Sequence, residues 1–287
     1  MYANVLEAAH FFRKLRGGSQ PILVQASDKC FYVVKLLTNP QGPNLLFNEG
    51  AGSELFRACQ LPVPFWKPIL LTKSFLERNP GCWPHLHTGA GPPPGGICFA
   101  SSFFGTGDQR ILDILPQSRH GRITDRSNFW IAWILDVCAD HADNRQALFS
   151  EADNGGLTTT FIDFGYMFGG PEGGDEPLPP ASRYLDWRIY PEMDIDHLHA
   201  LASTLSNFNS DRLWQRVTRL PDEWKTIPAL RAFNTALHSV CSKLIVQDVI
   251  EAIACDIRIR KTRGELPSAH PPRPSHAVLH AGIRAVA

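Results

Sequence analysis

Alternating hydrophobic and polar positions predict strands in the first third of the chain. From Ile22 to Leu37 the sequence is rich in Val, Ile, Phe and Tyr, and the polar turn 26–29 interrupts this run. Such a pattern predicts a hairpin. The expected strands are Ile22–Gln25, Cys30–Leu37, Trp66–Thr72 and Ile97–Phe104.

Helical spacing of apolar residues dominates elsewhere. The segment Asn44–Cys59 repeats Leu, Phe and Cys at intervals of a helical turn, and Asn128–Cys138 is apolar enough to predict a buried helix. Two short strands are expected beside Asp163, at Phe161–Ile162 and Tyr166–Phe168. Further helices are predicted at Ile195–Phe208, Ser210–Val217 and Ile227–Cys255.

Proline and glycine divide the chain into parts. Residues 79–96 form a Pro/Gly-rich stretch typical of a surface loop, and Gly105-Thr106-Gly107 resembles a hinge. We therefore expect an α+β protein with two lobes, whose ligand lies in the cleft between them. The predicted parts are a strand-rich lobe over 1–105, a mainly helical lobe over 106–257 and a basic, Pro-rich mobile tail over 258–287.

Composition narrows the functional classes. The 287 residues carry 28 basic and 28 acidic side chains, so no overall charge favours direct binding to nucleic acid or to an anionic membrane. No apolar run approaches the roughly 20 residues that span a bilayer. Charged residues interrupt the first 18 positions, so we expect no secretory leader and a cytoplasmic protein.

The seven cysteines are expected to be reduced. Most lie in apolar surroundings, which predicts buried thiols; these are Cys30, Cys59, Cys98, Cys138 and Cys241. A weak alternative is a zinc site at Cys82-x-x-His85-x-His87, which lacks an obvious fourth ligand.

Lys35 is the first residue that suggests chemistry. It lies within the apolar run Val33–Leu37, where a lysine either reaches out to water or serves a cleft by binding phosphates. A lysine that binds phosphates needs an acidic partner to hold it. Glu49 and Glu54 lie on the following predicted helix; we favour Glu49 and expect Glu54 to be a solvated residue.

Asp163 provides the second chemical group. It ends a strand and precedes Phe164-Gly165, so its carboxylate is placed to bind Mg²⁺ on a nucleotide, although Asp in a strand-end turn is also common. About 20 residues upstream a polar loop offers further groups for phosphoryl transfer. They are Asp136, Asp140, Asp143, Asn144 and Gln146.

Before the hairpin, Gly17-Gly18-Ser19 offers backbone amides and a hydroxyl to an anion, although paired glycines are usually only turns. Together these motifs resemble the HipA-like kinase family of bacteria, within the protein-kinase-like and phosphoinositide-kinase-like group. The resemblance covers about residues 5–250. It rests on Arg16-Gly-Gly-Ser-Gln20, Tyr32-Val-Val-Lys35, Asn48-Glu49, Leu61-Pro-Val-Pro64, His141-Ala-Asp-Asn-Arg-Gln146 and Phe161-Ile-Asp-Phe-Gly165.

The resemblance implies a bilobal protein-kinase-like fold and a role for each matched residue. Gly17, Gly18 and Ser19 would cover the phosphates of ATP, and Lys35, braced by Glu49, would hold them. Residues 100–103, including Ser101 and Phe103, would contact adenine. Asp143 would orient the substrate hydroxyl, and Gln146 and Asp163 would bind Mg²⁺.

One departure from the family concerns spacing. Kinases usually separate the catalytic Asp from the metal-binding Asn by five positions, whereas Asp143 precedes Gln146 by three and Asp140 precedes Asn144 by four. Three functions follow: a kinase for Ser/Thr hydroxyls on a protein, a small-molecule kinase, and a nucleotide-binding module with weak or no catalysis. The sequence does not identify the phosphate acceptor.

Overall fold

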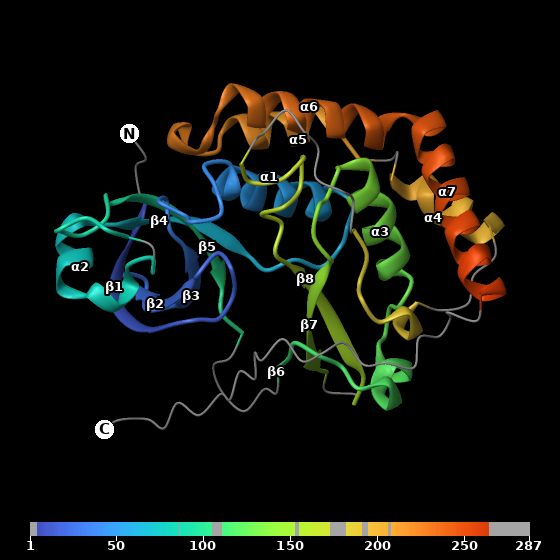
Figure 1. The fold of residues 1–287 in the computed structure, drawn as a ribbon. Helices are drawn as coiled ribbons and strands as arrows, with labels where there is room; N and C mark the ends of the chain where they lie inside the picture. The colour runs from blue at the N-terminus through green and yellow to red at the C-terminus, as the bar shows by residue number, and fades with distance from the viewer. Residues whose placement is uncertain are drawn as a thin grey trace.

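A five-stranded barrel forms one side of the molecule (Figure 1). The computed structural model describes residues 5–85, 87–104, 111–152, 155–172, 182–190, 195–205 and 208–263. The barrel strands are β1 (Leu6–Lys14), β2 (Ile22–Ala26), β3 (Phe31–Lys35), β4 (Trp66–Leu71) and β5 (Gly96–Ser102). Their order is β1-β2-β3-β5-β4, and a parallel pairing of β1 with β4 closes the barrel.

The interior of the barrel is a small apolar core of its own. Alternate residues of β2 and β3 point inward, among them Ile22, Val24 and Val34, all fully buried. Helix α2 (Lys73–Arg78) and the 3₁₀ turn η1 (Pro80–Cys82) pack on this core, and Cys82 belongs to it. The Pro/Gly-rich stretch 79–96 is therefore not entirely a surface loop.

Helix α1 (Leu45–Ala58) lies between the barrel and the rest of the chain (Figure 1). Every residue from Leu45 to Phe56 is buried, because the helix packs on β5 on one side and on two later helices on the other. A helix buried all round forms part of the core rather than an amphipathic cover.

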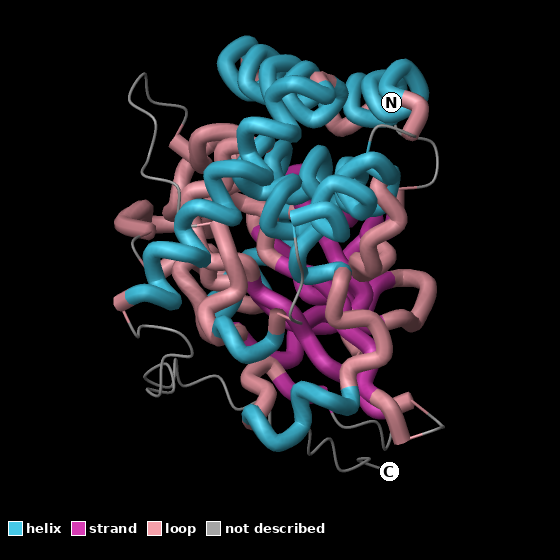
Figure 2. The backbone as a smooth tube through the Cα atoms, turned by 90° about the vertical axis from the view of Figure 1, so that its right-hand side faces the viewer, coloured by secondary structure: helices cyan, strands magenta, loops and turns pink. Residues whose placement is uncertain are grey.

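The opposite side contains a three-stranded antiparallel sheet and most of the helices. The sheet order is β6 (Ile111–Leu112), β7 (Gln146–Glu151) and β8 (Leu157–Ile162). Figure 2 shows the helices gathered above and in front of the strands. They are α3 (Asn128–Cys138), α4 (Ile195–Leu205), α5 (Ser210–Thr218), α6 (Ile227–Cys241) and α7 (Lys243–Thr262), with the 3₁₀ turns η2 (Gln117–Arg122), η3 (Trp187–Ile189) and η4 (Asp222–Trp224).

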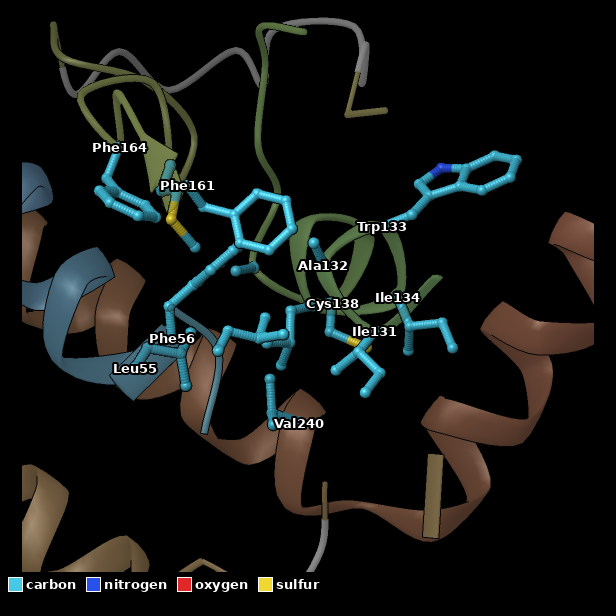
Figure 3. Packing of buried hydrophobic residues seen from close by; sticks show 14 of the residues in the cluster. Leu55, Phe56, Ile131, Ala132, Trp133, Ile134, Cys138, Phe161, Phe164 and Val240 are labelled. Atoms are coloured by element: carbon cyan, nitrogen blue, oxygen red, sulfur yellow. The ribbon is translucent and has the colours of Figure 1, made fainter. Parts of the chain in front are cut away.

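Aromatic rings join α1 to β8 inside the larger core (Figure 3). The ring of Phe56 meets that of Phe161 at 5.8 Å and that of Phe164 at 4.8 Å, both edge to face. Edge-to-face pairs contribute about 0.5–1.5 kcal/mol each beyond burial. Since Phe161 and Phe164 flank Asp163, this packing fixes the position of the strand-end carboxylate.

Most predicted elements are present, and the differences have local causes. Residues Tyr166–Phe168 form turns rather than a strand, with Phe168 at a φ of +59°. The single helix expected over Ile227–Cys255 is two helices, because Ser242 takes an extended conformation that ends α6. Strand β1 was not predicted, since two register irregularities break its alternation. Strand β7 and helix α2 were also not predicted.

Some expectations concern exposure or the ends of segments. Cys82, Cys98 and Cys138 are buried, but Cys30 and Cys241 are exposed, contrary to prediction. Helix α7 continues to Thr262, past residue 258 where the tail was expected to begin. The predicted hinge 105–107 and residues 264–287 lie outside the described residues. In the described part of the chain, every helix is too short or too polar to cross a bilayer.

We predict that Gly52→Ala destabilises the protein. A Cβ at position 52 would lie 2.6 Å from the Cβ of Phe164 and 2.8 Å from the Sδ of Met167. Although alanine favours helix by about 1 kcal/mol, overpacking costs about 1–3 kcal/mol, so we expect a net loss in the free energy of unfolding. Denaturant unfolding measures this loss.

The matched control for this prediction is Gly50→Ala, in the same helix. The nearest atoms there are the flexible methyl groups of Leu220, at 3.0 and 3.3 Å. This variant is expected to change stability by less than about 1 kcal/mol in either direction. Equal effects at positions 50 and 52 would contradict the packing argument.

Candidate active site

A cavity of about 480 Å³ is lined by ten of the residues that the sequence singled out, whereas Asp136, Asp140 and Asn144 do not line it. Its lining comes from the loop after β1, from β3, α1 and β5, and from the β7–β8 side of the molecule. The ten are Gly17, Gly18, Ser19, Lys35, Glu49, Ser101, Phe103, Asp143, Gln146 and Asp163. The structure thus brings them together, while their individual roles remain predictions.

Lys35 lies at the centre of the ionic contacts in the cavity. Its Nζ is 2.5 Å from Oε1 of Glu49 and 2.8 Å from Oδ1 of Asp163, and the residue is only 8% exposed. Burial alone would lower the pKa of Lys35, but the two carboxylates outweigh it and raise the pKa above its usual value. Lys35 is therefore a buried cation, and not a lysine that reaches out to water.

Glu49 is the partner of Lys35 on α1, whereas Glu54 has another function. Burial raises the pKa of Glu49, although Lys35 opposes this shift. Glu54 lies one turn further along the helix and is 7% exposed, so the prediction of a solvated residue is wrong. Its carboxylate accepts hydrogen bonds from Arg57, Arg216 and the indole of Trp66, which links α1 to α5 and β4.

Asp163 adopts a left-handed backbone conformation at the end of β8, with a φ of +64°. Residues with a short polar side chain tolerate this region best. Burial would raise the pKa of its carboxyl, but the neighbouring Lys35 charge and hydrogen bond outweigh burial and lower it. Side chains of helix α1 lie close to Gly165, where a Cβ would lie 2.6 Å from Leu45 Cδ1 and 3.1 Å from Glu49 Oε1.

Asn48 holds the segment that follows Asp163 against α1. Its side-chain amide donates to the carbonyl oxygens of Gly165, Met167 and Gly170, at 2.9, 2.9 and 3.1 Å. The residue is 1% exposed. The amide nitrogen has two hydrogens, so the three carbonyls share one buried donor group in a turn that has no strand partner. Asn48 belongs to the Asn48-Glu49 motif, but the sequence did not predict that its side chain binds these carbonyls.

Asp143, in the loop before β7, and Gln146, the first residue of β7, line the cavity, whereas Asp140 does not. Gln146 Nε2 donates to Asp163 Oδ2 at 2.9 Å, and Asp143 Oδ1 accepts from the backbone N–H of Asn144 at 2.7 Å. Burial, with the nearby Asp163 charge, raises the pKa of Asp143. A raised carboxyl pKa brings a group closer to the range in which it accepts a proton.

A buried ionic network centred on Arg145 supports the loop before β7. Arg145 donates to both carboxylate oxygens of Asp136, at 2.9 and 2.5 Å, and to the carbonyls of Ile162 and Asp163, at 3.0 and 3.1 Å. Its guanidinium also lies 4.7 Å from the ring centres of Phe56 and Phe164. The fork of Arg145 therefore joins α3 to the end of β8. Asp136 was a candidate for phosphoryl transfer, but both of its carboxylate oxygens are paired with Arg145, so its role is structural.

His141 belongs to the same network. It is fully buried, and its Nδ1 lies 3.3 Å from Nη2 of Arg145. Burial and the Arg145 charge lower the pKa of His141 well below its usual value. The ring is therefore neutral at physiological pH.

Ser101 and Phe103, which were expected to contact adenine, line the cavity at and just after the end of β5. The neighbouring backbone is largely occupied: Ser102 N–H donates to Phe65 O at 2.7 Å and Phe103 N–H to Phe31 O at 3.0 Å. Two further lining residues, Gln41 and Asp113, carried no motif in the sequence and were missed.

The donor set of the cavity suits magnesium and not zinc. Asp143, Asp163 and the side-chain carbonyl of Gln146 are oxygen donors, and Mg²⁺ typically takes one or two carboxylates together with phosphate oxygens. In the described residues no group of three His, Cys, Asp or Glu side chains is arranged to hold a metal. The weak zinc alternative is not supported, because Cys82 is buried in the barrel core and His87 contacts the carbonyl of Gly91.

Solved structures share this fold. No family model and no curated protein matches the sequence. The proinflammatory kinase CtkA of Helicobacter pylori is similar, with a TM-score of 0.54 and 12% identity over 88% of this chain and 99% of that one. The Golgi casein kinase has a TM-score of 0.52 and 13% identity over 86% and 74%. The chain therefore has a kinase-like α/β fold.

We predict that His141 makes the protein sensitive to acid. Because its pKa is lowered in the folded state, only the unfolded chain takes up a proton as the pH falls below about 6.5. Stability is full above that pH and decreases below it, by about 1.4 kcal/mol for this group between pH 7.5 and 5.5. His141→Gln should lose less stability over this interval, as urea unfolding at the two pH values will show.

The control for the pH experiment is His85→Gln, at an exposed position. It should keep the pH dependence of the unchanged protein. If His141→Gln has the same pH dependence as His85→Gln, His141 is not the neutral buried group described here.

Proposed function

We propose that the chain is an ATP- and Mg²⁺-dependent phosphotransferase of the HipA-like type that phosphorylates Ser/Thr hydroxyls on a protein. The observation that carries the proposal is the double contact of Lys35 with Glu49 and Asp163 inside a cavity lined by a glycine-rich loop. The kinase-like fold supports a phosphotransferase in general. The HipA-like type and ATP rest on the sequence motifs, and the protein acceptor is inferred from the HipA-like type alone.

Each residue has a role in the proposed reaction. Lys35, held by Glu49, binds the inner phosphates as a compact cation, and Gly17, Gly18 and Ser19 cover them. The carboxylate of Asp143 accepts a hydrogen bond from the attacking hydroxyl and orients it toward the γ-phosphorus. The pKa of this carboxyl, raised by burial, suits it to take the hydroxyl proton.

Asp163 and Gln146 are the residues that would hold Mg²⁺, with Asp143 nearby. When bound, the ion would neutralise negative charge on the phosphates. In the present structure the amide nitrogen of Gln146 donates to Asp163. A rotation of this amide turns its oxygen to the position of its nitrogen, so the same side chain can then serve as a metal ligand.

The proposal extends to the architecture and the location of the protein. We propose that the barrel with α1 and the β6–β8 sheet with the later helices are the two lobes of a kinase, with the cavity between them. The protein acts in the cytoplasm, on nucleotide and on an acceptor, without direct contact to nucleic acid or membrane. The absence of contact with nucleic acid or membrane is inferred from the balanced charge of the chain.

A second candidate function is a nucleotide-binding module that transfers no phosphate. The specific observation in its favour is the separation of Asp143 and Gln146 by three positions, where kinases have five. Gln146 is also a neutral amide on a longer side chain than asparagine. A small-molecule acceptor is a further variant of the first proposal. Nucleotide binding is common to all of these functions. Phosphate transfer separates the two kinases from the binding module, and the acceptor separates the kinases from each other.

We predict that Mg-ATP stabilises the protein and that Lys35→Met or Asp163→Ala abolishes this effect. A ligand at 100 times its Kd adds about 2.7 kcal/mol to the free energy of unfolding. The difference between unfolding with and without Mg-ATP is measured for each variant, so a loss of intrinsic stability does not interfere. Lys67→Ala is the control, because Lys67 lies on the barrel and pairs with Asp28. Stabilisation that persists in both site variants would refute the site.

We predict that the protein transfers labelled γ-phosphate to itself or to lysate proteins, and that Asp143→Asn reduces transfer by about 100-fold or more. Binding of Mg-ATP should remain in this variant. Asp140→Asn is the matched control, since Asp140 does not line the cavity. If the unchanged protein binds Mg-ATP but labels nothing, the second candidate function is favoured over the first.

A further inference from the structure

The turn between β3 and α1 contacts the glycine-rich loop directly. Residues Asn39–Gly42 form a turn closed by the Gly42 N–H and the Asn39 carbonyl, 3.3 Å apart. The side chain of Asn39 donates to the carbonyl of Ser19 at 2.9 Å and accepts from the N–H of Gln41 at 3.1 Å. The side chain of Asn39 thus stabilises the turn and links it to the glycine-rich loop.

Gln41 fills the space beside Gly18. A Cβ on Gly18 would lie 2.6 Å from Gln41 Nε2, so the amide of Gln41 occupies the volume that a larger residue 18 would need. Gln41 also lines the cavity together with Lys35 and Asp163. The absence of a side chain at position 18 is therefore matched to the presence of Gln41.

The other side of the turn is attached to the segment after Asp163. Gln41 Nε2 donates to the hydroxyl of Tyr166 at 3.2 Å, and Asn44 N–H donates to the carbonyl of Pro171 at 2.9 Å. Gly42, at a φ of +143°, leaves no room for a Cβ, which would lie 2.5 Å from the same carbonyl. Gln41 thus connects two segments that are 125 residues apart in sequence, counted from Gln41 to Tyr166.

We propose that Gln41 is a positioning residue for the phosphates of the bound nucleotide. Its side chain lies against Gly18 and is held there by the hydroxyl of Tyr166, so it supports the Gly17-Gly18-Ser19 loop. An amide nitrogen carries two hydrogens, so the group that holds Tyr166 can also donate to a phosphate oxygen. This inference rests on the proposed nucleotide site and adds a residue that selects for the phosphates over the nucleoside.

The effect of Gln41 should depend on the phosphates of the ligand. Loss of one hydrogen bond and of loop support should weaken Mg-ATP binding about three- to tenfold. Adenosine does not reach the glycine-rich loop, so its affinity should not change. Tyr166→Phe removes the hydroxyl and keeps the ring, and should weaken Mg-ATP binding in the same direction by a smaller factor.

We would measure Kd values for Mg-ATP and for adenosine from thermal unfolding at graded ligand concentrations. The variants are Gln41→Ala, Tyr166→Phe and the control Gln25→Ala, which removes a side-chain hydrogen bond to Lys29 O on the barrel hairpin. The expected result is a raised Kd for Mg-ATP alone in the first two variants. The unfolding temperature without ligand should be the same in Gln41→Ala and Gln25→Ala.

Three results would overturn the inference. Equal weakening of adenosine and Mg-ATP would show a general structural effect of Gln41. An unchanged Kd for Mg-ATP in Gln41→Ala would show no effect at all; in both cases the nucleotide site itself would stand. If the unchanged protein is stabilised by neither ligand, the proposed function fails, and this inference fails with it.

Discussion

The ion pair network of Lys35 is the interaction on which the rest of the site depends. Lys35 comes from the barrel, Glu49 from α1 and Asp163 from the end of β8, so a single ammonium joins three elements that fold from distant parts of the chain. Removing one member of a buried ionic set leaves an uncompensated charge, which costs about 3–5 kcal/mol. The ammonium of Lys35, which would bind phosphate, therefore also fixes the position of the barrel relative to the helical side.

Helix α1 provides the geometry for this network. Glu49 lies one residue after Asn48, which holds three carbonyls of the segment following Asp163, and Gly52 one turn later allows Phe164 to approach. Asn48, Glu49 and Gly52 thus position, on one helix, the backbone, the charge and the ring around Asp163. Arg145 supports the same corner from the other side, through the carbonyls of Ile162 and Asp163. Asp163 keeps its left-handed conformation because its neighbours are fixed on both sides.

Local patterns predicted the parts of the fold that are themselves local. The hairpin of β2 and β3, helix α1 and helix α3 follow from alternation and helical spacing within a few turns. Strand β1 was missed because irregular register breaks its alternation, and the two-residue strand β6 is too short to show a pattern. The break at Ser242 depends on how α6 and α7 pack, which the apolar repeat alone does not contain. Lys35 and Asp163 were singled out because charged groups within or beside apolar runs are unusual, whereas Ser101 and Phe103 were assigned only through the family resemblance. Gln41, Asn48 and Arg145 were not assigned roles because their importance lies in contacts with distant residues.

The charges in the cavity also bear on the need for a metal. The cavity is lined by four acidic residues and four basic ones: Glu49, Asp113, Asp143 and Asp163, and Lys35, Arg13, Lys14 and Arg16. Since Glu49 and Asp163 already accept hydrogen bonds from Lys35, its charge is largely compensated before any ligand arrives. A triphosphate placed beside Lys35 would meet the carboxylates of Glu49 and Asp163, and repulsion between like charges a few ångströms apart is strong in a partly buried site. A bound cation offsets this repulsion at Asp163, and the basic residues Arg13, Lys14 and Arg16 offset it near the glycine-rich loop. A metal is therefore favoured by the oxygen donors of Asp143, Gln146 and Asp163 rather than by the net charge of the cavity.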